Sequence, residues 1–415
     1  MLRIVIMATA TALVLLGLAA AQEGIRTARI KSVDAARQVI TLVVDGHDLD
    51  VEVTGQTRFF ESQATTIDER LKEFPAGTRV LFKTQSKNGK LLLEGIRKRP
   101  AGNRDGEAPP PPVDTTTFKP LTELGAATYH GFAGGLYPEG KNERPQAHEA
   151  AGLALANRLT PLDAEGEPAA DGKIVLLAIG MSNAMQAFGA FNLAADADPA
   201  RNPQVVLVNG AQGGMTASII QNAADGGRGF MYWKTVDERL IAAGVTVAQV
   251  QAVWVKQADA GPTSGFPQYA ETLRDELARI VQILPSRFPN VKLAYLSSRT
   301  FGGYAKTRLN PEPYAYESGF AVKWLIEQQL RGAPELNYDA AKGAAVAPWL
   351  SWGPYLWANG ATARADGFRY EAADFADDGT HESNGGQKKI ARLMLDFFKS
   401  DSTSKPWFLK QPTNK

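Results

Sequence analysis

The sequence of 415 residues contains no cysteine. Disulfides, thiolate zinc sites, a cysteine nucleophile and a lipidated cysteine behind a signal peptide are therefore excluded. The charge is balanced, with 45 Lys and Arg against 44 Asp and Glu, so no positive field is available to gather nucleic acid or an anionic membrane surface. The phosphate-loop pattern G-x-x-x-x-G-K-S/T and the zinc pattern H-E-x-x-H are also missing. We predict no nucleic-acid partner, no metal and no other cofactor.

The N-terminal end has the three parts of a secretory signal. Arg3 precedes an apolar run at residues 4–18, and Ala19-Ala20-Ala21 fits the small-x-small cleavage pattern. We predict a signal peptide at residues 1–21 and a secreted or periplasmic mature protein that no membrane segment anchors. An uncleaved anchor is the alternative, because the run is close to the lower limit of about 17 residues for a spanning helix.

Residues 25–100 have the pattern of short strands separated by turns. Apolar and polar residues alternate there, and the dipeptides Asp45-Gly46 and Asn88-Gly89 are typical of two-residue hairpin turns. We predict a small antiparallel β-barrel domain of the OB-like kind. Residues 101–120, which include four consecutive prolines, are predicted to form an extended linker.

The pattern changes in residues 121–402 to strands that alternate with helices. The strand candidates are continuous apolar runs, as expected of strands buried on both faces, and they lie at residues 174–179, 205–208, 250–255 and 291–296. Apolar residues recur at helical spacing over residues 273–284 and 390–397. We predict an α/β fold, a three-layer α/β/α domain with a parallel sheet, whose site lies at the carboxyl ends of the strands.

Three segments at the expected strand ends carry candidate catalytic residues. Ser182 directly follows the first run and is either a helix N-cap or a nucleophile. A glycine-rich turn at residues 209–216 follows the second run and either turns the chain or aims backbone N–H groups at a negative charge. Asp378 and His381 lie three positions apart in a turn before the last helix, which allows the carboxylate to orient the imidazole.

In that chain order these motifs resemble the SGNH (GDSL-like) hydrolases, over roughly residues 173–399. The resemblance implies that Ser182 is the nucleophile and that His381 is the general base oriented by Asp378. It also implies that Gly214 donates a backbone N–H to the oxyanion, or Gly213 if the register differs by one. The first motif departs from the Gly-Asp-Ser of many members, because Met181 stands in the middle.

The third strand end departs from the family as well. Many members have Gly-x-Asn-Asp there, and Ala258 stands in the place of the asparagine. The segment Gln257-Ala258-Asp259 nevertheless resembles the Gln-Gly-Glu of the sialate O-acetylesterase and acetylxylan esterase branch. The resemblance implies an oxyanion hole of Ser182 N, Gly214 N and the Gln257 side chain, and an ester of a carbohydrate.

Aromatic residues gather at residues 348–357, which we predict to form a loop shortly before the Asp-x-x-His turn. Trp352, Tyr355 and Trp357 are candidates for stacking on a sugar ring, and the alternative is that they cover the core. Asn183 and Arg299 are further candidate substrate contacts, although Arg299 is also a candidate to pair with Glu317.

We predict an exported serine esterase that removes short acyl groups, acetyl above all, from a small-molecule or polysaccharide ester. The alternative is a noncatalytic glycan-binding or cell-wall-associated protein on a degenerate hydrolase scaffold. The sequence does not indicate an oligomeric state.

Overall fold

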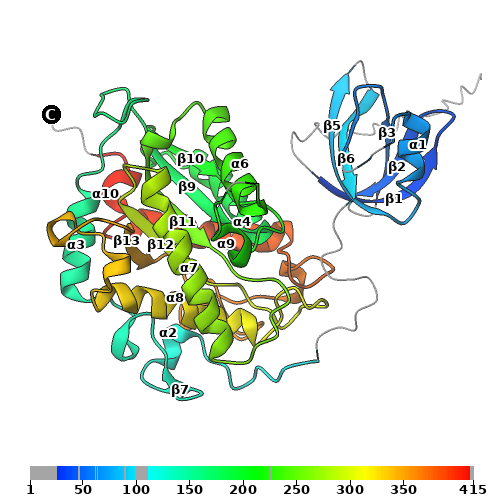
Figure 1. Cartoon of the computed structure of the whole chain (residues 1–415). Coiled ribbons are helices and arrows are strands. Elements are labelled where there is room, and N and C mark those ends of the chain that lie inside the picture. The colour runs from blue at the N-terminus through cyan, green and yellow to red at the C-terminus, as the bar shows by residue number, and fades with distance from the viewer. Residues whose placement is uncertain are drawn as a thin grey trace, which may run out of the picture. The chain divides into compact units, whose positions relative to one another are not determined.

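A computed structural model of the chain describes residues 26–44, 47–60, 62, 64–87, 90–98, 111–224 and 226–411. The chain forms two compact units, which divide after Gly102 (Figure 1). The expected signal peptide, the two hairpin-turn dipeptides and the first half of the expected linker lie outside the described residues. In the part of the chain that is described, no helix combines the length and the apolar character needed to cross a bilayer.

The first unit is the predicted small β-barrel. Its strands are β1 (Arg26–Asp34), β2 (Val39–Val44), β3 (His47–Glu52), β4 (Arg58–Phe59), β5 (Arg79–Lys87) and β6 (Lys90–Lys98). They run in the order β3-β2-β1-β5-β6-β4, and a β3–β6 pairing closes the sheet. The pairings are antiparallel except β3–β6 and β4–β6. Helix α1 (Ile67–Lys72) begins with a capping box between Thr66 and Glu69, and Leu71 on it packs into the barrel core.

The second unit contains a five-stranded sheet in the order β10-β9-β11-β12-β13. Its strands are β9 (Ile174–Gly180), β10 (Val205–Asn209), β11 (Val250–Lys256), β12 (Leu293–Ser297) and β13 (Trp349–Trp352). All its pairings are parallel, and every residue of β9 and β11 is buried, as their continuous apolar runs require. The four predicted strands are confirmed, whereas β13 lies in the segment that we predicted to be a loop.

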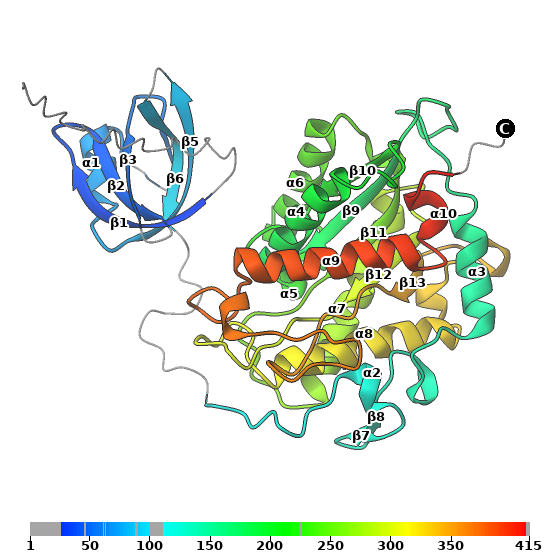
Figure 2. The same cartoon turned by 180° about the vertical axis from the view of Figure 1, so that it is seen from behind.

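Helices cover both faces of this sheet, so the predicted α/β/α arrangement is observed (Figures 1 and 2). One face packs against α3 (Gln146–Ala156), α4 (Ser182–Asp196), α9 (Asn384–Ser400) and α10 (Lys405–Phe408). The other packs against α5 (Ala217–Ile220), α6 (Arg228–Ala242), α7 (Gln268–Arg287) and α8 (Tyr314–Leu330). The remaining short elements are α2 (Leu121–Leu124), β7 (Thr128–Tyr129), β8 (Phe132–Ala133) and the 3-10 turns Pro138–Gly140, Val247–Gln249, Pro334–Leu336, Ala340–Lys342 and Ala372–Asp374.

The described half of the expected linker lies on the second unit. The side-chain amide of Asn359 donates to the carbonyl oxygens of Thr115 at 2.7 Å and Phe118 at 3.0 Å. The hydroxyl of Tyr316 donates to the Lys119 carbonyl at 2.9 Å. These bonds hold residues 115–119 against the α/β unit, so this half of the segment does not act as a free spacer.

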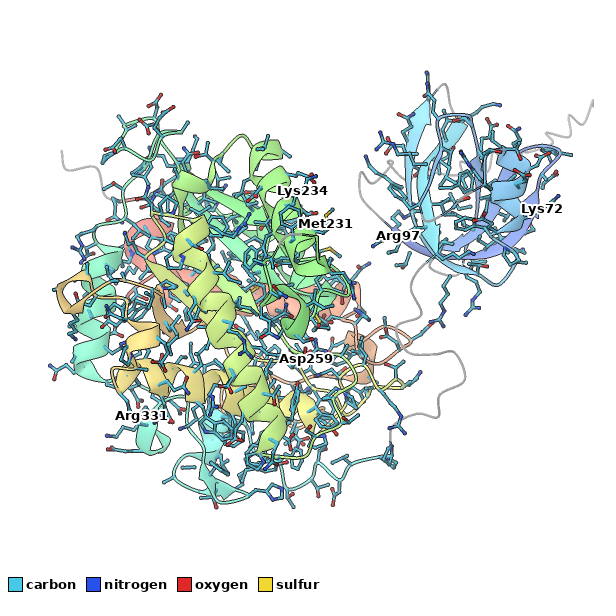
Figure 3. The ribbon with its side chains drawn as sticks, in the orientation of Figure 1. Lys72, Arg97, Met231, Lys234, Asp259 and Arg331 are labelled. Atoms are coloured by element: carbon cyan, nitrogen blue, oxygen red, sulfur yellow. The ribbon has the colours of Figure 1, made fainter. Side chains whose placement is uncertain are left out.

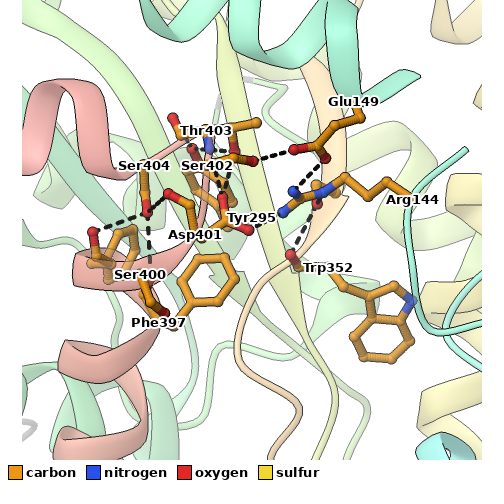
Figure 4. Close-up of polar contacts among 12 residues, drawn as sticks. Arg144, Glu149, Tyr295, Trp352, Phe397, Ser400, Asp401, Ser402, Thr403 and Ser404 are labelled. Carbon is orange, nitrogen blue, oxygen red and sulfur yellow. Dashed lines mark hydrogen bonds and ion pairs between the residues drawn. The ribbon is translucent and has the colours of Figure 1, made fainter. Parts of the chain in front are cut away.

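A buried polar network fixes the chain before α3 and after α9 (Figure 4). Arg144 donates to Ser351 at 2.7 Å and to Glu149 at 2.8 Å, and it also pairs with Asp401. The Arg144 side chain is 10% exposed. Its guanidinium group donates to three side chains from separate segments of the chain. His148, which lies in the same region, stacks on Trp349 and bonds to the Leu350 carbonyl at 2.7 Å. His148 is therefore a structural residue.

Candidate active site

Gly180 joins the end of β9 to the start of α4, and the surrounding atoms leave no space for a side chain at this position. A Cβ on this residue would lie 2.3 Å from the Lys256 carbonyl oxygen and 2.4 Å from the Ala184 Cβ. Only glycine lets α4 begin this close to the neighbouring strand β11. The sharp connection places Ser182 at the first position of α4, where its backbone N–H has no partner within the helix.

Ser182 is not a helix N-cap, so that interpretation was wrong. Met181 holds the cap position, and no side chain caps the helix. The Oγ of Ser182 lies 2.8 Å from Nε2 of His381, and this contact joins the start of α4 to the turn before α9.

Asp378 fixes the other side of the imidazole. Its Oδ2 lies 2.6 Å from Nδ1 of His381, and its Oδ1 accepts the backbone N–H groups of Thr380 at 3.0 Å and His381 at 2.9 Å. Burial acts to raise the pKa of the Asp378 carboxyl, but these hydrogen bonds and the charge of His381 outweigh it and hold that pKa well below its usual range. The ionised carboxylate accepts from Nδ1–H, which leaves Nε2 free to accept from the serine hydroxyl.

The turn that carries this pair depends on Gly379. Its φ is +65°, and a Cβ there would lie 1.7 Å from the Tyr304 carbonyl oxygen. A glycine is required on both grounds, so the Asp-Gly-Thr-His spacing has a backbone cause as well as a chemical one.

The glycine-rich loop lies beside Ser182. A Cβ on Gly213 would be 3.9 Å from the Ser182 Cβ, and Gly214 has a φ of +73°. The Gly214 carbonyl accepts from Arg228 at 3.0 Å. Within the described part of the chain, the N–H groups of Gly213 and Gly214 have no backbone partner. Both are therefore available to donate to a negative charge near Ser182.

Gln257 supports this loop from inside. It is 2% exposed, its Nε2 donates to the Met215 carbonyl at 2.8 Å, and its Oε1 accepts from the Ala258 N–H at 3.1 Å. Asp259, which follows β11 (Figure 3), accepts the Ser218 N–H at 3.1 Å. The family resemblance implied that the Gln257 amide lies in the oxyanion hole, whereas in the structure this amide donates to the Met215 carbonyl, in the loop that supplies the backbone donors.

Two of the predicted substrate contacts are wrong, because the side chains are buried and bonded within the protein. Asn183 is 1% exposed, and its amide donates to the Thr380 carbonyl at 2.8 Å and to Glu382 at 3.0 Å. Arg299 is 4% exposed, and its Nη1 lies 3.5 Å from the Asn183 Oδ1. The candidate Arg299 partner Glu317 instead accepts from the Tyr129 hydroxyl at 3.0 Å.

The three candidate stacking aromatics also belong to the core. Trp352, Tyr355 and Trp357 are 2%, 8% and 1% exposed. The Trp352 indole donates to the Leu136 carbonyl at 2.6 Å, and the Trp357 indole donates to Glu312 at 2.8 Å. The segment begins as strand β13, which is covered on both faces, so these rings have no free face to offer a sugar. The segment Trp349–Trp352, which is apolar except for Ser351, was the signal for that strand.

Sequence reasoning missed a buried ion pair beneath the site. The Nζ of Lys256 lies 3.9 Å from the Oε1 of Glu382, with the two side chains 1% and 0% exposed. Burial lowers the pKa of Lys256 to about 8, an effect that the charge of Arg299 assists and that of Glu382 opposes. Nothing in the sequence pattern marks either residue as buried, because most charged residues lie at the surface.

No group of three or more His, Cys, Asp or Glu side chains in the described ranges could hold a metal ion. The site consists instead of a hydroxyl, an imidazole and a carboxylate in hydrogen-bonded sequence, beside free backbone N–H groups. Such an arrangement is suited to nucleophilic acyl transfer.

No family model matches the sequence, and no curated protein does. Among solved structures, silver-bound CusF from Escherichia coli is 21% identical, with 19% of this chain and 96% of that chain covered and a TM-score of 0.14. The lipase Lip_vut3 from a goat rumen metagenome is 10% identical (54% and 97% covered, TM-score 0.32). A putative platelet activating factor from Streptococcus pneumonia is 11% identical (61% and 91% covered, TM-score 0.29). At these values the likenesses carry no argument about activity.

Proposed function

We propose that the protein is a serine esterase that hydrolyses short-chain acyl esters. The observation that supports this proposal is the continuous hydrogen-bonded series from Asp378 through His381 to Ser182, at 2.6 Å and 2.8 Å. Each member has the partner that its role requires, and the series lies where the carboxyl ends of parallel strands meet.

In the first half of the reaction Ser182 Oγ attacks the ester carbonyl carbon, and its proton passes to Nε2 of His381. The imidazolium that results is stabilised by the ionised Asp378. The carbonyl oxygen becomes an oxyanion, which accepts from the backbone N–H of Ser182 and from those of Gly213 and Gly214. The intermediate then collapses, His381 protonates the departing alkoxide, and the acyl group stays on Ser182.

In the second half water attacks the acyl-serine. His381 takes a proton from the water, a second oxyanion forms in the same donor set, and collapse releases the carboxylic acid and restores the Ser182 hydroxyl. Gln257 acts indirectly in both halves, because it holds the loop that carries two of the donors.

The finer parts of the proposal are an acetyl group, a carbohydrate alcohol and export from the cell. The carbohydrate alcohol is proposed on the likeness of Gln257-Ala258-Asp259 to the carbohydrate esterase branch, since the buried aromatics no longer support it. Export is proposed on the sequence of residues 1–21. The noncatalytic glycan-binding alternative rests on the departures at Met181 and Ala258, and the continuous hydrogen-bonded series from Asp378 to Ser182 favours the esterase over it.

The test is hydrolysis of p-nitrophenyl acetate, butyrate and octanoate by the mature chain, beside Ser182→Ala. Ser286→Ala is the matched control, because Ser286 is an exposed helical serine whose hydroxyl bonds to the Ile283 carbonyl. We expect a rate that falls with acyl length, a loss of at least about a thousandfold in Ser182→Ala, and no change in the control. A Ser182→Ala protein with the wild-type rate would overturn the proposal.

A further inference from the structure

Glu382 follows the candidate base directly in the chain and is completely enclosed. Its side chain is 0% exposed, and both carboxylate oxygens have partners. The Oε1 accepts from the Thr300 hydroxyl at 2.9 Å, and the Oε2 accepts from the Asn183 amide at 3.0 Å. A buried carboxylate with this many protein partners is held in one orientation.

The partners of Glu382 come from three different strand ends. Asn183 follows Ser182 at the start of α4, Thr300 lies after the end of β12, and Lys256 is the last residue of β11. Asn183 also donates to the Thr380 carbonyl at 2.8 Å. The residue after the nucleophile is therefore cross-linked twice to the turn that carries the base.

The charge of Glu382 is balanced locally. Lys256 Nζ lies 3.9 Å away and has no hydrogen-bond partner in the described part of the chain, so Glu382 is its main source of compensation. Arg299 is buried beside them, and the negative charges of Glu382, Glu312 and Asp378 stabilise its guanidinium cation. Removing only the carboxylate charge would leave two buried cations with less compensation, a costly arrangement.

We propose that Glu382, with Lys256 as its counter-charge, is a positioning residue that sets the distance between the Ser182 hydroxyl and the His381 imidazole. This inference deepens the proposed function and rests on it. Glu382 is enclosed and does not reach the substrate, so it acts through Asn183 and through the backbone of its own turn. A displacement of about 1 Å at reacting groups costs about a hundredfold in rate, and that is the scale on which the residue acts.

The first variant is Glu382→Gln in the mature chain, which keeps the shape and removes the charge. We expect kcat to fall by about ten- to a hundredfold while KM for p-nitrophenyl acetate stays within about twofold. The double variant Lys256→Met with Glu382→Gln removes both charges, and we expect it to recover at least part of the lost kcat. If Glu382 were important only for stability, Glu382→Gln would lower the amount of folded protein but leave kcat per folded molecule unchanged. The double variant would then have no lost kcat to recover.

Asp401→Asn is the matched control, because Asp401 also pairs with a mostly buried cation, Arg144. It follows the 17-residue helix α9, about 25 Å along the axis from the end next to His381. We expect its kcat to be unchanged. If Glu382→Gln does not fold, Thr300→Val decides the matter, because it removes one bond to the carboxylate and keeps the volume.

The outcomes separate the two proposals. A wild type without Ser182-dependent hydrolysis overturns the proposed function itself. If the wild type shows Ser182-dependent hydrolysis and folded Glu382→Gln keeps the wild-type kcat, only the positioning role of Glu382 is overturned. If Glu382→Gln does not fold, a wild-type kcat in Thr300→Val overturns that role instead. A kcat loss that the double variant does not relieve overturns the counter-charge role of Lys256.

Discussion

The Oγ of Ser182 and the Nε2 of His381 lie 2.8 Å apart, although 199 positions separate the two residues in the chain. Two glycines make this approach possible. Gly180 lets α4 start against β11, and Gly379 lets the His381 turn pass against the Tyr304 backbone. The hydrogen bond therefore depends on backbone positions that carry no chemistry themselves.

Gly180→Ala tests this dependence. The new Cβ would lie 2.3 Å from the Lys256 carbonyl oxygen, so the start of α4 must shift. We expect a loss of about 1–3 kcal/mol in the free energy of unfolding and a fall in esterase kcat. Gly189→Ala, in the helix α4 that follows Gly180, is the control, because its Cβ would lie an ordinary 3.9 Å from the Asn209 amide. Urea unfolding and p-nitrophenyl acetate assays of both proteins check the contrast, and equal behaviour of the two would contradict it.

Asp378→Asn removes the carboxylate that holds the imidazole. An amide in its place favours the wrong tautomer, and we expect kcat to fall by up to about 10⁴-fold with little change in KM. The neighbour Asp377 is exposed, so Asp377→Asn should keep the wild-type kcat. Steady-state kinetics of the two variants decide the point, and a Asp378→Asn enzyme within tenfold of the wild type would contradict the assigned role.

We expect the burial of His148 to make the protein less stable in acid. Burial lowers its pKa to about 4, partly opposed by the bond to the Leu350 carbonyl, whereas the unfolded chain has the usual value near 6.5. Between about pH 6.5 and 4 the unfolded state therefore binds more protons than the folded state. The contribution of neutral His148 to the free energy of unfolding is complete above this window and is lost as the pH falls through it. Calorimetric Tm values should fall less over this window in His148→Gln than in the wild type. Parallel curves would contradict the prediction.

Trp357→Phe distinguishes a core residue from a sugar platform. The change removes the indole bond to Glu312 at 2.8 Å and leaves a buried carboxylate with one partner fewer, which costs about 1–3 kcal/mol. We expect a lower Tm and an unchanged KM for acetylated sugars that the enzyme cleaves. An unchanged Tm with a KM raised more than tenfold would restore the stacking role.

The fold was largely predictable because its central strands are buried on both faces. Strands β9 and β11 are seven-residue runs with every residue enclosed, and such runs stand out in a sequence. Strand β13 has four residues among prolines and glycines, and its tryptophans resembled a binding loop. Burial of an aromatic residue depends on what the rest of the chain packs against it, which a local pattern does not contain.

The site was predictable only where a motif fixes geometry. Asp378 and His381 meet because three positions in a glycine turn bring them together. Asn183 and Arg299 were placed toward a substrate because they follow strands, but a position at a strand end does not say which way a side chain points. Both side chains are hydrogen-bonded in the interior, as is usual for buried polar groups. Glu382 was missed because its sequence position likewise does not show that its side chain points inward.

Covalent labelling with a fluorophosphonate reports directly whether Ser182 is the nucleophile. Trypsin releases residues 174–201 as one peptide, in which Ser182 is the only hydroxyl side chain, so mass spectrometry locates the adduct without ambiguity. We expect a stoichiometric adduct on this peptide in the wild type, none in Ser182→Ala, and much slower labelling in His381→Ala. A wild type that hydrolyses p-nitrophenyl acetate but carries no adduct on residues 174–201 would contradict the assignment of Ser182 as the nucleophile.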